Sequence, residues 1–438
     1  MSKPIYGIDL GTTNSLIGVN GKLISGLVPS IVDLKNKRAG ESERYNMDTE
    51  RGFKTDMSLS ISGTMPIAAS SEVLKELKHV ANVENEEIDA VISVPAYFNQ
   101  SQRRATIKAA KNAKINVVSL INEPTAAAIY ISKGKPGVYM IFDLGGGTFD
   151  ISIIESSPNG TYRVLATDGC ILGGNDFDEA ICNYIANQTE SPWQFAADKY
   201  AMTVANEIKH EMTAFPPVDR VVKKSHLGGE EMIVTKEKYI SIMKEVFFKA
   251  VMLSKAVIAE SKMSVDDLSF YFVGGSTKCP YLRQWVQEEL DVFASAVSEY
   301  NQDTVVAEGA CYYAELFEKG LATELLTDIS KNIGFDRGDG IMEVLINKNS
   351  NIPFSNETIH TTTRVSESGE IKLEFYQGDS VFISDCEHIG SVSLKINEQT
   401  MTGEAIFGVK ISVSADGLMT VTCNEILGEP VEVIMKGV

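Results

Sequence analysis

The sequence predicts an α/β region built from two similar halves, followed by an all-β region. Three observations lead to this fold class: a hairpin pattern with Asp-Leu-Gly at its turn occurs twice, strands and helices alternate after the first copy, and short strands alone follow about residue 330. The length of 438 residues allows two or three domains. We divide the chain into an α/β domain at 1–322, a linker at 323–330 and a β domain at 331–438.

Two segments share one hairpin design. Residues 4–19 read PIYGIDLGTTNSLIGV, in which two apolar runs meet at a Gly-Thr-Thr-Asn-Ser turn. Residues 138–154 read VYMIFDLGGGTFDISII and repeat the apolar run, the Asp-Leu-Gly and a turn of small residues. This repeat predicts a duplicated fold with a site between the copies.

Strand and helix patterns alternate through the rest of the α/β region. The first expected elements are a strand at 88–94, a helix at about 99–113, a strand at 116–121 and a helix from Glu123. Helices are then expected within 175–215 and 236–263, separated by a turn-rich polar stretch at 216–234. A strand, turn and helix at 267–290 and a helix at 303–319 complete the region. After about 330, short apolar runs separated by Gly, Asn, Asp and Pro predict antiparallel strands. The linker is apolar at Leu325, Leu326 and Ile329, so we expect it to dock against the folded protein.

Composition and charge exclude several classes of function. The net charge of −19 disfavours binding to nucleic acid or to anionic membranes. No apolar run reaches the length of about 18 residues that a membrane span needs, and Asp9 interrupts the place of a signal peptide, which indicates a cytoplasmic protein. The six cysteines and five histidines form no metal-binding or disulfide pattern.

The Gly-rich turns indicate a phosphate site. The turns at 11–13 and 145–148 offer backbone N–H groups and hydroxyls, although either turn alone would more often be structural. A third turn of this kind lies at 274–277. Asp9 and Asp143 stand just before the first two turns, where carboxylates can hold the waters of a Mg²⁺ ion. The P-loop and dinucleotide-binding patterns are absent from the sequence.

Motifs along nearly the whole chain resemble the seventy-kilodalton heat-shock protein chaperone family. They are IDLGTTNS (8–15), ISVPAYFNQSQRRAT (92–106), INEPTAAAI (121–129), FDLGGGTFDISI (142–153), LGGNDFD (172–178), VGGSTKCP (273–280), IPFSNET (352–358), FYQGD (375–379) and ADGLMTVT (415–422). The resemblance implies an α/β actin-like ATPase domain, duplicated and with two lobes around ATP or ADP and Mg²⁺, and then an all-β sandwich peptide-binding domain.

The resemblance also implies roles for particular residues. The catalytic ones would be Lys54, Glu123, Asp143, Thr148 and Asp150, with Asp9 and Asp143 holding Mg²⁺ through water. Lys54 is chosen because it lies between the first hairpin and the strand at 88, and an exposed loop lysine is the alternative. The nucleotide would be bound by Gly11, Thr12, Thr13, Asn14, Gly145, Gly146, Gly147, Thr148, Lys209, Gly274, Gly275, Ser276 and Lys278.

Some positions depart from the family pattern. Asn206, His210 and Thr213 replace residues of the base site, so we expect weaker nucleotide binding. Ser119 replaces an arginine used with J-domain partners, which makes J-domain stimulation a weaker expectation than ATP hydrolysis; a nucleotide exchange factor is the other implied co-chaperone.

The resemblance extends to coupling and peptide binding. Coupling would run through the switch proline Pro95, the relay arginine Arg103 and the linker residues Leu325, Leu326 and Asp328. The peptide groove would fall on Phe335, Thr361, Thr363, Ile371 and Leu373, with core packing as the alternative for each. Gly338 and Thr363 stand where relatives arch a Met and an Ala over the peptide. The sequence stops at Val438, before a helical lid, so we expect fast peptide exchange, either in a shortened chain or in a naturally lidless member.

Together these features predict an ATP-dependent chaperone that hydrolyses ATP with Mg²⁺ and couples hydrolysis to binding and release of unfolded peptide segments. A nucleotide-regulated peptide-binding protein with impaired hydrolysis is an open alternative, because the segment 20–75 is short and the base site is altered. A small-molecule kinase of the actin-like fold, which would lack the linker and the β domain, and a filament-forming protein of that fold are weaker rivals.

Overall fold

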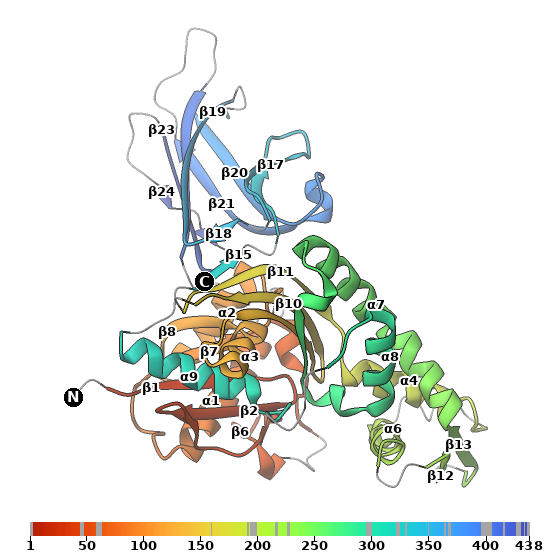
Figure 1. Ribbon diagram of the computed structural model, residues 1–438. Coiled ribbons are helices and arrows are strands. Elements are labelled where there is room, and N and C mark those ends of the chain that lie inside the picture. Colours follow the sequence, from red (N-terminus) through yellow and green to blue (C-terminus); the bar gives the residue numbers. More distant parts are fainter. Residues whose placement is uncertain are drawn as a thin grey trace.

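The computed structural model gives the fold of most of the chain (Figure 1). It describes residues 3–43, 48–57, 64–158, 160–190, 192, 199–214, 218–225, 228–294, 300–320, 325–328, 331–348, 350–362, 365–366, 369–395, 405–414, 417–425, 431–432 and 434–435. No helix in these ranges has both the length and the apolar character needed to cross a membrane.

The first sheet is built around the N-terminal hairpin. Its strands run in the order β3-β2-β1-β7-β8, with β4 beside β2. β1 is antiparallel to β2 and parallel to β7, which is parallel to β8. The bounds are β1 Ile5–Asp9, β2 Asn14–Val19, β3 Lys22–Leu23, β4 Val28–Pro29, β7 Ile88–Val94 and β8 Ile115–Asn122, with a small pair β5 Val32–Asp33 and β6 Arg38–Ala39 nearby.

Helices α1 (Thr64–Val80) and α2 (Gln100–Asn112) share a core with this sheet. Asn99 and Gln102 form a capping box that starts α2, and buried Lys78 of α1 donates to Ala113 O (3.1 Å) at its end. The sequence predicted α2 within one residue at each end. It did not predict α1.

The second sheet repeats the hairpin and the parallel neighbour. Its order is β14-β9-β10-β11-β15-β18, with β9 antiparallel to β10 and parallel to β14. The bounds are β9 Gly137–Leu144, β10 Thr148–Ser156, β11 Tyr162–Ile171, β14 Leu268–Val273, β15 Leu325–Asp328 and β18 Asn351–Ile352. A large core joins it to α4 Gly174–Ala186, α6 Lys199–Glu211, α7 Lys236–Ser261 and α8 Pro280–Leu290.

Helices α3 (Glu123–Ser132) and α9 (Val305–Glu318) lie between the two sheets. Their core includes Val91 of the first sheet and Ile141 of the second. The helices approach closely at Gly309, where a Cβ atom would lie 2.0 Å from Ala126 O. The two halves are therefore joined through a packed layer of helices and meet elsewhere around a pocket.

The polar stretch at 216–234, expected to be a turn-rich segment, instead contains a hairpin. Strands β12 (Arg220–Lys224) and β13 (Glu231–Thr235) pair antiparallel. Each strand alternates in burial, and Val221 and Met232 join the core of the second half. The expectation of turns was wrong because each strand has only five residues and charged residues interrupt its apolar positions.

The β region has two antiparallel sheets with a common core. One runs β17-β16-β20-β21-β25 and the other β19-β22-β23-β24. In β20 the alternating burial of Ile371, Leu373 and Phe375 turns one face to this core. The bounds are β16 Ile333–Asp336, β17 Met342–Ile346, β19 Phe354–Thr362, β20 Glu370–Gln377, β21 Glu387–Lys395, β22 Ala405–Val413, β23 Met419–Glu425, β24 Val431–Glu432 and β25 Ile434–Met435.

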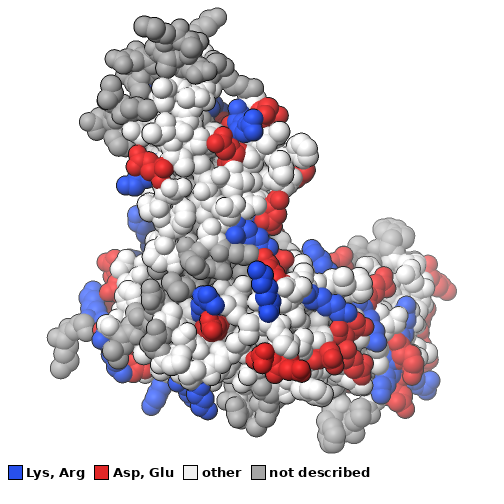
Figure 2. Space-filling view, turned by 45° about the horizontal axis from the view of Figure 1, so that its top comes forward, with Lys and Arg blue, Asp and Glu red and all other residues white. Residues whose placement is uncertain are grey.

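The β region stands on the α/β region, next to α2 and β11 (Figure 1). The backbone of the linker forms β15, which is parallel to β11 with Leu325 opposite Tyr162. Gln100 of α2 donates to Gly417 O (2.6 Å), and Arg104 donates to Met419 O (2.6 Å). On the face in Figure 2, acidic side chains gather mainly on the α/β region, beside scattered Lys and Arg.

Candidate functional site

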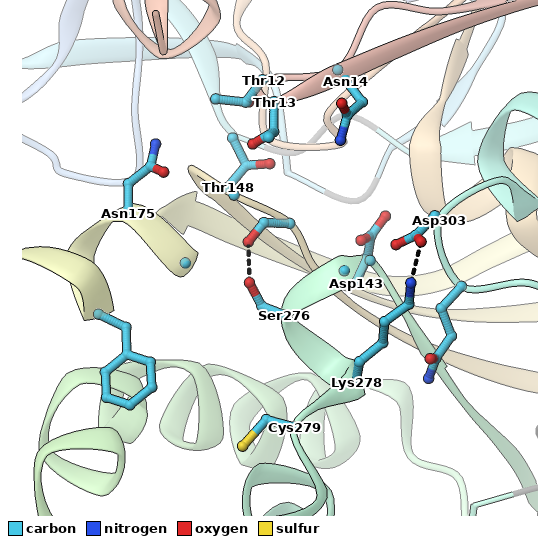
Figure 3. Close-up of a pocket in the computed structure, with 18 of the residues that line it drawn as sticks. Thr12, Thr13, Asn14, Asp143, Thr148, Asn175, Ser276, Lys278, Cys279 and Asp303 are labelled. Atoms are coloured by element: carbon cyan, nitrogen blue, oxygen red, sulfur yellow. Dashed lines mark hydrogen bonds and ion pairs between the residues drawn. The ribbon is translucent and has the colours of Figure 1, made fainter. Parts of the chain in front are cut away.

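The Gly-rich turns of both halves open onto one pocket of about 430 Å³. Thr12 and Thr13 come from the turn after β1, and Thr148 comes from the start of β10 (Figure 3). Ser276 and Lys278 lie on a short 3-10 turn after β14. The turns that are far apart in the sequence therefore converge on one cavity, as the repeat predicted.

The first two turns are in close contact. A Cβ atom added at Gly146 would lie 2.0 Å from Thr13 Oγ1, and one added at Gly147 would lie 2.8 Å from Thr12 Cγ2. Ser30 Oγ fixes the first turn by donating to Gly11 O (2.8 Å). Glycine is thus needed for the two turns to approach each other.

The second turn is also held by its neighbours. Gly174 N and Asn175 N donate to Gly145 O (3.0 Å) and Gly146 O (2.8 Å) at the start of α4. Ser276 Oγ donates to Gly145 O (2.8 Å), so the third turn is tied to the second (Figure 3). These hydrogen bonds occupy the carbonyl oxygens of the second turn. The opposite side of the turn presents backbone N–H groups, which are suited to binding an anion.

A buried cluster of charges lies below the turns. Lys54 Nζ donates to Glu123 Oε1 (2.5 Å), and the two side chains are 3% and 10% exposed. Asp143 and Asp150 stand opposite each other on β9 and β10. Asp9 Oδ1 accepts from Ser93 Oγ at 2.6 Å. The exposed-loop alternative for Lys54 is wrong.

The carboxyl groups of this cluster resist ionisation. Burial first, and then the neighbouring Glu123, raise the pKa of both Asp143 and Asp150 well above the usual range. Burial also raises the pKa of Glu123, against the opposing effect of Lys54. For Lys54 itself, burial lowers the pKa, but Glu123 and Asp9 outweigh it and the net shift is upward. Lys54 therefore stays charged among several carboxyl groups.

This excess of carboxyl groups fits a bound Mg²⁺ ion. The described residues contain no group of three or more His, Cys, Asp or Glu arranged as direct ligands. Asp9 and Asp143 would then hold the ion through its waters, as Mg²⁺ commonly keeps several of them. An added cation would also relieve the repulsion that raises the carboxyl pKa values.

The other end of the pocket is lined by a different set of polar and aromatic residues. Lys209 Nζ donates to Asp178 Oδ2 (2.8 Å), which also accepts from Asn206 Nδ2 (3.0 Å). Lys278 pairs with Asp303, which lies beside the same turn (Figure 3). His210, Thr213, Tyr239, Phe247 and Cys279 complete this end. An aromatic base with polar edges suits such a lining.

Comparison with known proteins identifies the chain. A family model described as Hsp70 protein matches residues 42–435. The chain belongs to the Hsp70 family. It is 32% identical to a chaperone protein HscA homolog of Vibrio vulnificus and 30% identical to one of Histophilus somni, over 97% of this chain and 76% of each relative. The resemblance drawn from the motifs is thereby confirmed.

The structure brings most of the expected nucleotide residues of this Hsp70 member together. All thirteen except Gly147 line the pocket, and so do Lys54, Glu123 and Asp143. Gly147 packs on Thr12 behind the turn. Asp9 and Asp150 lie beneath the pocket and act electrostatically on the groups that line it.

Of the expected coupling residues, Pro95 and Arg103 lie beside this site, whereas the linker pairs with the opposite end of β11. Pro95 immediately precedes Ala96, whose N–H donates to Asp150 Oδ1 (2.7 Å). Arg103 donates to Phe98 O (3.1 Å) and to Asn122 Oδ1 (2.7 Å), next to Glu123. The backbone of Leu325, Leu326 and Asp328 forms β15, whereas their side chains lie outside the described part.

The expected peptide positions are placed differently. Phe335, Ile371 and Leu373 are 3–4% exposed and belong to the core of the β region, as the packing alternative anticipated. Thr361 is exposed on β19, and Thr363 lies outside the described residues. In this conformation the three apolar side chains are covered.

The motifs did not single out several residues that shape the site. Ser15 and Ser30 bond to each other (2.9 Å) under the first turn, and Ser93 holds Asp9. Asn175 and Asp303 line the pocket itself. Asn175 follows the two glycines of LGGNDFD, which could have indicated it, but nothing in the sequence marks Ser30 as the partner of Ser15.

Proposed function

We propose that this Hsp70 member binds Mg·ATP in the pocket between its two halves and hydrolyses it. The observation that carries the proposal is the buried Lys54–Glu123 pair beside Asp9, Asp143 and Asp150, directly under the two facing turns. An ion pair with a purely structural role is rarely accompanied by so many buried carboxyl groups. Their mutual repulsion destabilises the fold unless a cation or a ligand offsets it.

The domain division is proposed on the same basis. We assign 1–322 to a duplicated, actin-like ATPase domain, 323–330 to the linker and 331–438 to a β-sandwich that binds peptide. The repeated hairpins with parallel neighbours support the first assignment. The separate core within 333–423 supports the last.

Hydrolysis would use this chain's own residues as follows. The N–H groups and hydroxyls of Thr12, Thr13 and Thr148 hold the phosphate oxygens. A water attacks the terminal phosphorus, a P–O bond forms, and the bond to the leaving ADP oxygen breaks. Bound Mg²⁺ would offset phosphate charge.

Two groups are suited to the proton and charge changes of this step. Asp150 is fixed by Ala96 N, and in its ionised form it is placed to accept the proton that the water loses, as a stronger base than an ordinary aspartate because its pKa is raised. The Lys54 ammonium, held by Glu123, stabilises negative charge on the phosphoryl oxygens.

Coupling to the β region would run through α2 and the linker. Ala96 contacts Asp150 at the site, and a few residues later Gln100 and Arg104 bond to the backbone of the β region. A change at Asp150 can therefore reach the β region through one short segment. We propose that ATP turnover alters the binding of unfolded peptide segments to the β region through this segment, as expected of a chaperone. The relatives named above are described as chaperone proteins.

The proposal is tested by measuring ATP binding and phosphate release on the same preparation. Wild type should bind ATP in the presence of Mg²⁺ and release phosphate slowly. Binding without release would favour the alternative of a nucleotide-regulated protein with impaired hydrolysis, whereas the absence of nucleotide binding would contradict the proposal. Transfer of the terminal phosphoryl group of ATP to a sugar or to glycerol would instead indicate a kinase.

A further inference from the structure

The two sheets of the β region meet along an edge formed by β17 and β19. In the described part of the chain, β19 stands last in its sheet beside β22, and β17 stands last in its sheet beside β16, with Met342 N at its start also donating to Val381 O (2.9 Å). His360 of β19 contacts Glu343 of β17 across this edge, with 3.1 Å between Nδ1 and Oε1. One imidazole therefore bridges the two sheets.

The ring of His360 fills the space between the sheets at this edge. It lies edge-on to Phe335, with ring centroids 4.9 Å apart, and nearly parallel to Phe407 at 5.6 Å. Both phenylalanines are buried, and the His360 side chain is 11% exposed. The imidazole thus covers an aromatic surface that would otherwise face the edge.

Both nitrogens of the ring have a polar partner, which restricts its position. Nε2 lies 2.7 Å from Thr358 Oγ1, two residues earlier on the same face of β19, and Nδ1 contacts Glu343. A ring held only by apolar contacts could take several orientations, whereas the hydrogen bond to Thr358 and the polar contact with Glu343 favour one. Ile359 and Val344, the strand neighbours of His360 and Glu343, point to the outer faces of the two sheets and are 68% and 41% exposed.

We propose that His360 controls access to this slot and sets the size of the pocket that receives an apolar side chain of an extended peptide. The inference rests on the proposed function, because it takes the β region as the peptide-binding part. A peptide strand beside β19 would use the outer backbone edge of that strand and direct alternate side chains inward. An inward side chain reaches Phe335 only when the imidazole turns away.

The test compares the binding of a labelled Leu-rich heptapeptide to variants of the full chain, by fluorescence anisotropy and stopped-flow mixing. His360→Ala should raise the association rate and the affinity by roughly tenfold or more, because an apolar slot opens between two rings. His360→Phe, which refills the slot, should bind no tighter than wild type.

A second variant tests the role of His360 without enlarging the slot between Phe335 and Phe407. Glu343→Gln weakens the bond that anchors Nδ1 but leaves the volume of the slot unchanged, so the association rate should rise a few-fold. Glu357→Gln, an exposed change on the same strand, is the matched control and should leave the rate at the wild-type value. A merely structural role for His360 would change stability but not the association rate.

Two results would overturn the inference, and they can be told apart. If wild type binds the peptide while His360→Ala and Glu343→Gln associate at the wild-type rate, His360 is no gate and the proposed function stands. If neither wild type nor any variant binds the peptide, peptide binding by the β region is itself refuted, and the gate with it.

Discussion

Gln100 of helix α2 and Met419 of strand β23, 319 residues apart, are joined by a buried hydrogen bond from Met419 N to Gln100 Oε1 (2.9 Å). The same carboxamide donates to Gly417 O, so it pairs with the β region as a strand backbone would. Asn99 adds a bond to Glu387. The start of α2 is therefore one of the places at which the two regions are joined, besides β15.

Replacing Gln100 should loosen this attachment. Gln100→Ala leaves Met419 N and Gly417 O without their partner, which costs about 1–3 kcal/mol for a buried polar group. Hydrogen exchange at Met419 should then become at least several-fold faster. Gln284→Ala, an exposed change on α8, serves as the control. Unchanged protection of Met419 would show that other contacts hold the interface.

Asp143→Asn should abolish ATP turnover and leave the fold intact. The carboxylate is proposed to hold waters of Mg²⁺, and its loss should reduce phosphate release by about a hundredfold or more. The substitution is nearly isosteric and relieves repulsion with Asp150, so the melting temperature should not fall. Asp266→Asn, in an exposed turn, is the control. Turnover at the wild-type rate would refute the assignment of Asp143.

Gly146→Ala should weaken nucleotide binding. The added Cβ would lie 2.0 Å from Thr13 Oγ1, so the Thr13 side chain must move out of the first turn. We expect a loss of affinity for ATP of about tenfold or more, because fewer donors reach the phosphates. Gly26→Ala meets nothing within 4 Å and is the matched control. Calorimetric titration would reveal equal affinities if the turns do not bind phosphate.

The buried carboxyl groups predict a dependence of stability on pH. Because burial and mutual repulsion raise the pKa of Asp143, Asp150 and Glu123, the folded state binds more protons than the unfolded state above about pH 4. The free energy of unfolding of the nucleotide-free protein should therefore fall as the pH rises through the window between the ordinary and the raised pKa values.

Thermal unfolding between pH 6 and pH 8 measures this effect. Asp143→Asn should show a flatter profile than wild type, and Mg²⁺ with ADP should stabilise wild type more at pH 8 than at pH 6. Parallel profiles for wild type and Asp143→Asn would mean that Asp143 does not titrate abnormally.

The sequence was sufficient where a pattern is local. The Asp-Leu-Gly hairpins and the capped helix at 100–112 depend on neighbouring residues, and they were predicted nearly to the residue. Lys54 could be selected by its position between two recognisable elements, although its burial against Glu123 arises from folding.

The rest depends on contacts that no local pattern encodes. The hairpin at 220–235 was missed because its strands are only five residues long and carry charged residues between the apolar ones. The cover over Phe335 comes from His360, a polar residue that would be expected on the surface and is buried here by its bonds to Thr358 and Glu343. The interface at Gln100 joins segments that are hundreds of residues apart.

Single-turnover hydrolysis of ATP, with and without an unfolded Leu-rich peptide, tests the central claim most directly. Slow cleavage of bound ATP that the peptide accelerates, and that Lys54→Ala eliminates while Lys75→Ala does not, is the result expected of an ATP-hydrolysing chaperone. ATP that stays intact in wild type while the peptide still binds would contradict hydrolysis at this site and leave a nucleotide-regulated peptide-binding protein.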